Sequence, residues 1–138
     1  MPSLIGLGLA VSMAIFARIT GLDRDRAFYP VALIVIASYY ILFAVVGGDR
    51  SDLRTETLIF LLFAAIAIAG FRFSLWLVVG GLAAHGLFDF FHHGVVAGRG
   101  VPSWWPAFCL AYDVAAAVCL TVLLAVCPTA SRPVSPLP

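Results

Sequence analysis

The sequence predicts an all-α, polytopic transmembrane helix bundle, and its composition carries the prediction. Of the 138 residues, 63% are hydrophobic and only 11% are charged, whereas soluble domains carry about 25% charged residues. The mean hydropathy is +1.09. Because a spanning helix needs about 20 apolar residues, the chain has room for about five such helices, with four as the alternative.

The balance of charges excludes nucleic acid as a partner. Eight basic residues, all of them arginine, stand against seven acidic residues, which gives a net charge of +1. A nucleic-acid-binding protein needs a concentration of positive charge that this chain lacks. We therefore expect the lipid bilayer to be the main surroundings of the chain.

Five apolar stretches are the candidate spans of a single transmembrane domain over residues 1–127. No Lys or Arg precedes the first stretch, unlike in a cleavable signal peptide, so we expect it to be retained as a helix. Pro30 suits the first turn of the second helix, where its missing N–H costs nothing. The predicted spans are 4–20, 28–46, 55–70, 75–97 and 105–126.

The third span is the shortest of the five. The segment GGDRSDLRTE before it holds five charges, so we predict a wet loop or an interfacial turn there. About 16 helical residues cover only ~24 Å of a ~30 Å hydrocarbon core, so this helix begins near Leu53 or the bilayer thins around it. The Pro/Ser-rich tail, 128–138, is predicted to be disordered.

The cysteines and arginines are less informative about the fold than the apolar stretches are. Cys109, Cys119 and Cys127 lie ten and eight residues apart, too far for a disulfide within one helix, so we expect packing roles. Five arginines fall on the side of the membrane that holds the C-terminus and three on the other. The positive-inside tendency then favours an N-out, C-in orientation.

Five of the seven acidic residues lie in predicted loops or next to them, which leaves two carboxylates and all three histidines well inside the spans. An ionised Asp89 or Asp113 would cost about 2.5–3.5 kcal/mol at the bilayer centre, so each needs a proton, a partner, water or a metal. In AHGLFDFFHH, a helical rotation of about 100° per residue places His85, Asp89, His92 and His93 on one stripe. Asp89 lies within one turn of each histidine, so it is the predicted hub of the stripe.

Neighbouring helices are expected to add polar groups at the same depth. If the fourth and fifth helices form an antiparallel hairpin, Asp113 lies level with Asp89. The second helix should run parallel to the fourth, which sets Ser38 level with the first histidine and Tyr39 and Tyr40 just beyond it. These hydroxyls are candidate partners of the stripe.

A mixture of histidines and carboxylates suits a divalent zinc, iron or manganese ion. An open position on such an ion would make a bound water nucleophilic. The first hypothesis is therefore metal-dependent hydrolysis or modification of a lipid-like substrate. The candidate metal ligands are His85, Asp89, His92, His93 and Asp113, and the candidate catalytic residues are Asp89, Asp113, Ser38 and Tyr39.

Two other interpretations stay open for the same residues. In the first, the residues relay protons or coordinate ions in a transporter or a channel-like homo-oligomer. Alternatively, they would be hydrogen-bonded packing groups in a non-catalytic membrane subunit.

Four blocks of the sequence resemble a family of small bacterial integral membrane proteins of unknown function. The blocks are LDRDRAFYP, ASYYILFAVVGG, AHGLFDFFHH and VPSWWPAFCLAYDV, and the likeness covers most of the chain except the tail. The resemblance implies a multi-pass bacterial membrane protein, which we expect in the inner membrane.

A second likeness concerns residue types only. Ser38, Asp89, His85, His92 and His93 are similar to the serine, aspartate and histidines of the ceramidase-like superfamily of intramembrane zinc hydrolases. That superfamily has about seven helices and distributes its histidines over more than one of them. This chain predicts five helices and places all three histidines in one, so the likeness is chemical.

Overall fold

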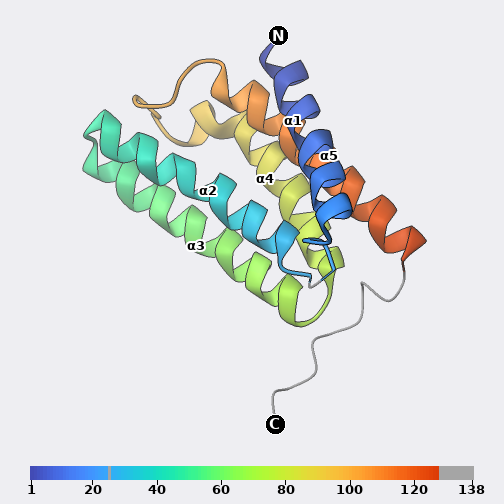
Figure 1. The fold of residues 1–138 in the computed structure, drawn as a ribbon. Coiled ribbons are helices and arrows are strands. Elements are labelled where there is room, and N and C mark those ends of the chain that lie inside the picture. The colour runs from blue at the N-terminus through green and yellow to red at the C-terminus, as the bar shows by residue number, and fades with distance from the viewer. Residues whose placement is uncertain (25, 128–138) are drawn as a thin grey trace.

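The fold is known from a computed structural model, which describes residues 1–24 and 26–127. These residues form five α-helices and no strand, as the sequence predicts (Figure 1). The predicted tail, 128–138, lies outside the described residues. The helices are α1 (Pro2–Thr20), α2 (Phe28–Gly47), α3 (Arg50–Arg72), α4 (Leu75–Val95) and α5 (Trp105–Val126).

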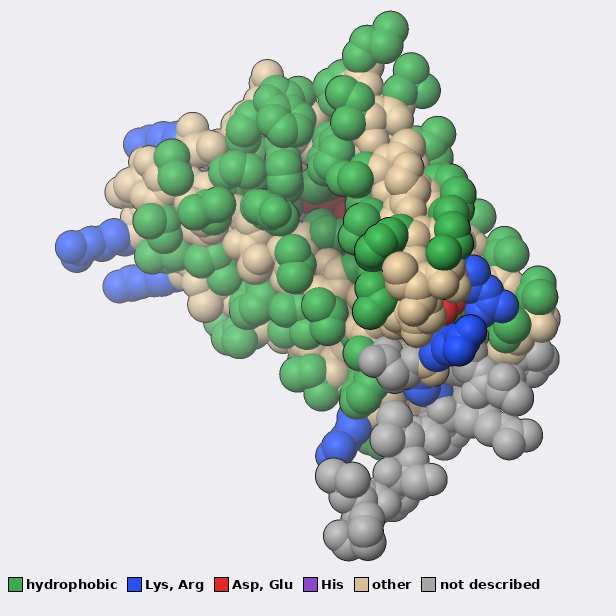
Figure 2. Space-filling view, in the orientation of Figure 1, with side chains coloured by type: hydrophobic (Ala, Val, Ile, Leu, Met, Phe, Trp, Pro, Cys, Tyr) green, Lys and Arg blue, Asp and Glu red, His purple; other side chains and the backbone are tan. Residues whose placement is uncertain are grey.

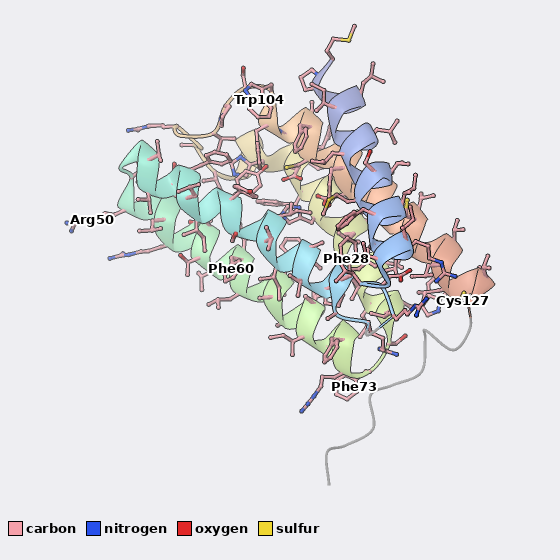
Figure 3. The ribbon with its side chains drawn as sticks, in the orientation of Figure 1. Phe28, Arg50, Phe60, Phe73, Trp104 and Cys127 are labelled. Atoms are coloured by element: carbon pink, nitrogen blue, oxygen red, sulfur yellow. The ribbon has the colours of Figure 1, made fainter. Side chains whose placement is uncertain are left out.

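Each of the five helices is long and apolar enough to cross a membrane. The surface agrees with this, because hydrophobic side chains cover the middle of the face drawn in Figure 2 and basic side chains gather towards its ends. In Figure 3, Arg50 and Trp104 lie at one end of the bundle, and Phe73 and Cys127 lie at the other. The prediction of five spanning helices rather than four is confirmed.

The sequence prediction was wrong about the start of α3. This helix begins at Arg50, so most of the predicted wet loop is helical. Asp49 is the N-cap, and its side chain accepts hydrogen bonds from the backbone N–H groups of Ser51 and Asp52, which satisfies two donors that a helix start leaves unpaired. The result is a helix of 23 residues, about 34 Å long, which needs no thinned bilayer.

The turn between α2 and α3 is tight because of a glycine. Gly48 adopts a left-handed conformation with φ of 71° and donates its N–H to the carbonyls of Ala44 and Val45. This is a conformation that glycine adopts without steric cost. The second span, predicted over 28–46, is helical over Phe28–Gly47, and α2 and α3 run antiparallel side by side (Figure 1).

The helices pack in the spatial order α1, α5, α4, α3, α2, with α2 also touching α4 and α5. A Cβ on Gly6 would collide with the carbonyl oxygen of Phe108. Because Gly6 has no side chain, α1 can approach the backbone of α5 closely at this point. Leu33, Val78 and Leu82 are fully buried in the apolar core. This packing encloses α4 between α3 and α5, which is where the polar stripe lies.

Candidate functional site

The interior of the bundle contains a group of buried polar side chains, which we call the polar core. Four of the five helices contribute to it, and every member is at most 2% exposed. Its members are Tyr40 of α2, Glu56 of α3, His85, Asp89 and His92 of α4, and Asp113 of α5.

Three members of the polar core form the His85 cluster, which consists of His85, Asp89 and Asp113. Nδ1 of His85 lies 2.7 Å from Oδ2 of Asp113 and 3.4 Å from Oδ2 of Asp89. One ligand atom from each residue lies within 4.8 Å of the others. The predicted alignment of Asp113 with Asp89 across the α4–α5 hairpin is thus confirmed.

Tyr40 closes the His85 cluster on the side of α2. Its hydroxyl donates a hydrogen bond of 2.5 Å to Oδ1 of Asp89. Its ring also stacks on His92, with ring centroids 4.3 Å apart and an interplanar angle of 23°. Tyr40 therefore contacts two successive members of the polar stripe on α4.

His92 has a carboxylate partner of its own. Nε2 of His92 lies 2.6 Å from Oε1 of Glu56, and both side chains are buried. Since His85 and His92 are about 10.5 Å apart along the helix axis, the stripe carries two separate histidine–carboxylate pairs at successive depths.

The loop after α4 covers the Glu56–His92 pair. Gly98 donates its N–H to Oδ2 of Asp52 over 3.1 Å, which ties this loop to the first turn of α3. A Cβ on Gly98 would lie 2.9 Å from Cε1 of His92, and φ of Gly98 is +57°. The loop thus needs glycine here both for its backbone conformation and for its close approach to the histidine.

Three carboxylate oxygens of the polar core are buried and have no hydrogen-bond partner within the described part of the chain. They are Oδ2 of Asp89, Oδ1 of Asp113 and Oε2 of Glu56. An unsatisfied buried acceptor costs about 1–3 kcal/mol, and more when it is charged. Two of the three belong to the His85 cluster, so that cluster has acceptor capacity for a cation or a proton.

The donor set of the His85 cluster suits a divalent transition metal. It offers one imidazole nitrogen and two carboxylates, which is a mixture that zinc, iron and manganese accept. Two ligands of a tetrahedral zinc ion stand roughly 3.3 Å apart, close to the 3.4 Å between Nδ1 of His85 and Oδ2 of Asp89. The 2.7 Å contact with Asp113 would have to open by about 0.6 Å on this geometry.

The predicted residues divide into two groups. His85, Asp89 and Asp113 meet, whereas His92 binds Glu56 instead of joining them. The side chain of His93 lies outside the described part of the structure.

Two predicted hydroxyl partners are elsewhere. Ser38 donates to the carbonyl oxygen of Val35 in its own helix over 2.6 Å, and the ring of Tyr39 packs on Phe43 and Trp105. The hydroxyl that reaches the cluster is that of Tyr40, which lies two residues from Ser38 and therefore about 200° around the helix. The depth argument named Ser38, Tyr39 and Tyr40 as candidate partners, and the rotation of α2 selects Tyr40 among them.

Glu56 is the member of the polar core that the sequence reasoning missed. Five nearby charges made its segment look like a loop, whereas Glu56 lies two turns inside α3 and is 2% exposed. The available signal was Asp49, because an aspartate is a favourable N-cap residue and a helix starting just after it has the length to span a membrane.

All three cysteines are free, as the spacing predicts. Cys109 is buried, one turn of α5 before Asp113. It packs beside the polar core without a disulfide.

The fold and the polar core together define a five-helix bundle suited to a membrane with ionisable groups enclosed at its centre. Comparison with protein-family models, with curated proteins and with solved structures found no match. The geometry of the polar core is therefore the basis of the proposed function.

Proposed function

We propose that this protein binds a divalent transition-metal ion inside the membrane through His85, Asp89 and Asp113. The observation that carries the proposal is the convergence of three potential ligand atoms within 4.8 Å of one another. Two carboxylate oxygens there lack another partner among the described residues. Buried carboxylates of this kind are expected to pair, to protonate or to hold a metal.

Charge neutrality supports the same proposal. With a neutral imidazole, the two aspartates carry two negative charges in an interior of low dielectric constant, where unpaired charge is costly. One divalent cation neutralises both. Without it, two protons are needed for the same effect, so metal binding and proton uptake are competing ways to stabilise the same cluster.

The burial of the cluster bears on its chemistry. His85, Asp89 and Asp113 are at most 1% exposed, which favours an ion over a bulky molecule as the primary occupant. A bound metal would activate water at this site for hydrolysis or modification of a lipid-like substrate. That reaction requires the substrate to reach the cluster from the bilayer, so metal binding is the first property to establish.

Elemental analysis of the detergent-purified protein tests the proposal. After incubation with zinc, iron or manganese and removal of excess ion, we expect near-stoichiometric metal in the wild type and loss of most of it in His85→Ala and Asp113→Asn. Ser38→Ala is the matched control, because its hydroxyl bonds to its own helix. Absence of metal from a folded wild type, or full retention in His85→Ala, overturns the proposal.

Proton passage is a second candidate, favoured by the two histidine–carboxylate pairs at successive depths of α4. The pairs meet at Tyr40, whose hydroxyl bonds Asp89 but whose ring stacks on His92. A stacked ring contact does not itself transfer a proton, so this contact alone does not link the two pairs into one hydrogen-bonded chain. Proton flux into liposomes that is abolished by Asp113→Asn, in protein without metal, would support this alternative.

For the location, we propose the bacterial inner membrane with the N-terminus outside. Resemblance of the sequence blocks supports the bacterial membrane, and the arginines support the orientation. Among the described residues, four arginines lie at the end of the bundle where α1 terminates, namely Arg18, Arg24, Arg26 and Arg72, against Arg50, Arg54 and Arg99 at the other. Cysteine accessibility at each end in whole cells tests this orientation.

A further inference from the structure

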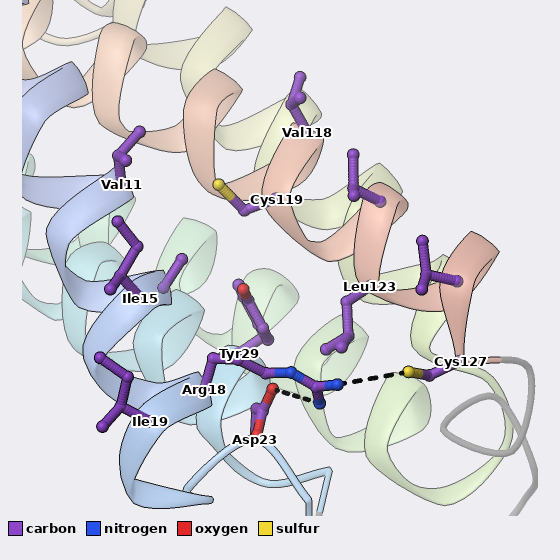
Figure 4. A pocket seen from close by; sticks show the side chains of 13 residues that line it. Val11, Ile15, Arg18, Ile19, Asp23, Tyr29, Val118, Cys119, Leu123 and Cys127 are labelled. Carbon is purple, nitrogen blue, oxygen red and sulfur yellow. Dashed lines mark hydrogen bonds and ion pairs between the residues drawn. The ribbon is translucent and has the colours of Figure 1, made fainter.

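An apolar groove runs between α1 and α5, on the outside of the bundle and away from the polar core. The two helices are in close contact near Gly6 and separate towards their C-terminal ends (Figure 4). The lower part of the groove has a volume of about 420 Å³ and is lined by residues such as Val11, Ile15 and Leu123. We call it the α1–α5 groove.

The groove continues upwards along the same two helices. A second hollow of about 600 Å³ is lined by Leu4, Leu7 and Leu110 and shares Val11, Val118 and Cys119 with the first. From Leu4 to Arg18 the helix rises about 21 Å, which is more than one leaflet of a ~30 Å hydrocarbon core. The groove is thus long enough for an acyl chain to lie along it.

One end of the groove is polar. The guanidinium of Arg18 extends from α1 across the lower mouth towards α5 (Figure 4). It lies 3.5 Å from Oδ2 of Asp23 and 3.6 Å from Sγ of Cys127. The contact with Asp23 is long and Cys127 offers a weak sulfur acceptor. Because a guanidinium has five N–H donors, Arg18 has donors left for a stronger acceptor.

Position and charge make an anionic lipid the fitting occupant. Arg18 is in the last turn of α1, where a spanning helix reaches the headgroup region, and its side chain is 58% exposed. Arginine binds phosphate through paired charge-assisted hydrogen bonds. Over residues 18–26 the sequence has three arginines and two aspartates, so this end of the groove carries a net charge of +1.

We propose that the α1–α5 groove binds one anionic phospholipid, with an acyl chain along the groove and the phosphate on Arg18. The site is independent of the metal proposed in the polar core, since none of its lining residues belongs to that core. It assigns to α1 the role of holding a structural lipid against α5.

Native mass spectrometry of the full chain in a mild detergent tests the proposal. The probes are phosphatidylglycerol and phosphatidylcholine with identical acyl chains. We expect tighter binding of phosphatidylglycerol to the wild type, and Arg18→Gln should weaken that binding about fivefold, the effect of one basic side chain near anionic lipid. Arg24→Gln removes the same charge from a residue that does not line the groove and should weaken binding less than Arg18→Gln does.

A second pair of variants tests the acyl chain. Ala14→Phe fills the groove and should weaken binding of both lipids, whereas Val45→Phe places the same aromatic ring at an exposed position of α2 and should leave binding unchanged. Equal affinity for the two lipids, equal losses in Arg18→Gln and Arg24→Gln, or no effect of Ala14→Phe overturns the proposal. If the wild type forms a lipid-free dimer and Ala14→Phe dissociates that dimer, a second copy of the chain occupies the groove. This result also overturns the proposal.

Discussion

Tyr40 joins the two halves of the polar core, because its hydroxyl donates to Oδ1 of Asp89 while its ring stacks on His92. The hydroxyl sets the position of a proposed metal ligand. The ring separates the His85 cluster from the Glu56–His92 pair. One residue of α2 therefore fixes the geometry of two sites on α4.

Tyr40→Phe removes the hydroxyl and keeps the ring. Oδ1 of Asp89 loses its donor, so we expect the free energy of unfolding to fall by about 1–2 kcal/mol and metal affinity to fall about 10- to 100-fold, as for other groups that orient a ligand. Titration with SDS in mixed micelles and competition with a chelator measure the two effects. Tyr39→Phe is the control, since the ring contacts of Tyr39 survive; equal effects in both variants would contradict the role of Tyr40.

The Glu56–His92 pair is expected to stabilise the packing of α3 on α4. In a double-mutant cycle with Glu56→Gln and His92→Gln, the single variants should each lose about 1–2 kcal/mol, and the coupling energy should be about 0.5–1.7 kcal/mol. Unfolding in mixed micelles gives all four values. Additive losses would show that the 2.6 Å contact carries no energy of its own.

Gly6 and Gly8 give a matched test of helix packing. A Cβ on Gly6 would collide with the carbonyl oxygen of Phe108, whereas one on Gly8 meets nothing within 4 Å. Gly6→Ala should therefore destabilise the protein by about 1–3 kcal/mol through overpacking. Gly8→Ala should be neutral or stabilise the protein by up to about 1 kcal/mol, because alanine favours the helix. Thermal unfolding in detergent measures both effects. If Gly6→Ala is the more stable of the two variants, the α1–α5 packing is contradicted.

Metal affinity is expected to fall as the pH falls. Protons and a divalent cation compete for the same carboxylates and imidazole, so binding releases protons. Release of one proton gives about a tenfold loss of affinity for each pH unit of acidification, and release of two gives about a hundredfold loss. Calorimetry in buffers of different protonation enthalpy counts the protons, and affinity independent of pH would argue against these ligands.

Asp49 is expected to stabilise the start of α3, which carries Glu56 into the membrane. Hydrogen bonds from the backbone N–H of Ser51, and then of Asp52, lower the pKa of the Asp49 carboxyl below its ordinary value. The stabilisation is therefore present above about pH 4 and lost on further acidification through the lowered pKa. Asp49→Ala should lower the Tm at neutral pH, and Asp49→Asn, which can still cap, should lower it less.

The apolar core and the spanning helices follow from local patterning. Hydropathy marks each span, and the helical repeat of 100° per residue places His85 and Asp89 on one face before any partner is known. Asp113 joins them because a short loop makes α4 and α5 an antiparallel hairpin, so that equal depth follows from residue counting.

The partner of each polar side chain depends on properties that residue counting does not contain. Counting gives the depth of a residue but not the rotation of its helix, and rotation brings Tyr40 to Asp89 while Ser38 bonds to its own backbone. Likewise, His92 pairs with Glu56, which the early start of α3 at Arg50 places about two turns inside the helix.

Hydropathy and helical periodicity act within one segment, so they are enough to predict a bundle of about five spanning helices with a polar stripe on the fourth. The tertiary structure is needed to bring Asp89 and Asp113 to His85 and Glu56 to His92. It also decided that α1 and α5 separate into a groove with Arg18 across its mouth. Contacts between helices depend on how each helix is rotated and where it begins, and these are set by packing of the whole bundle.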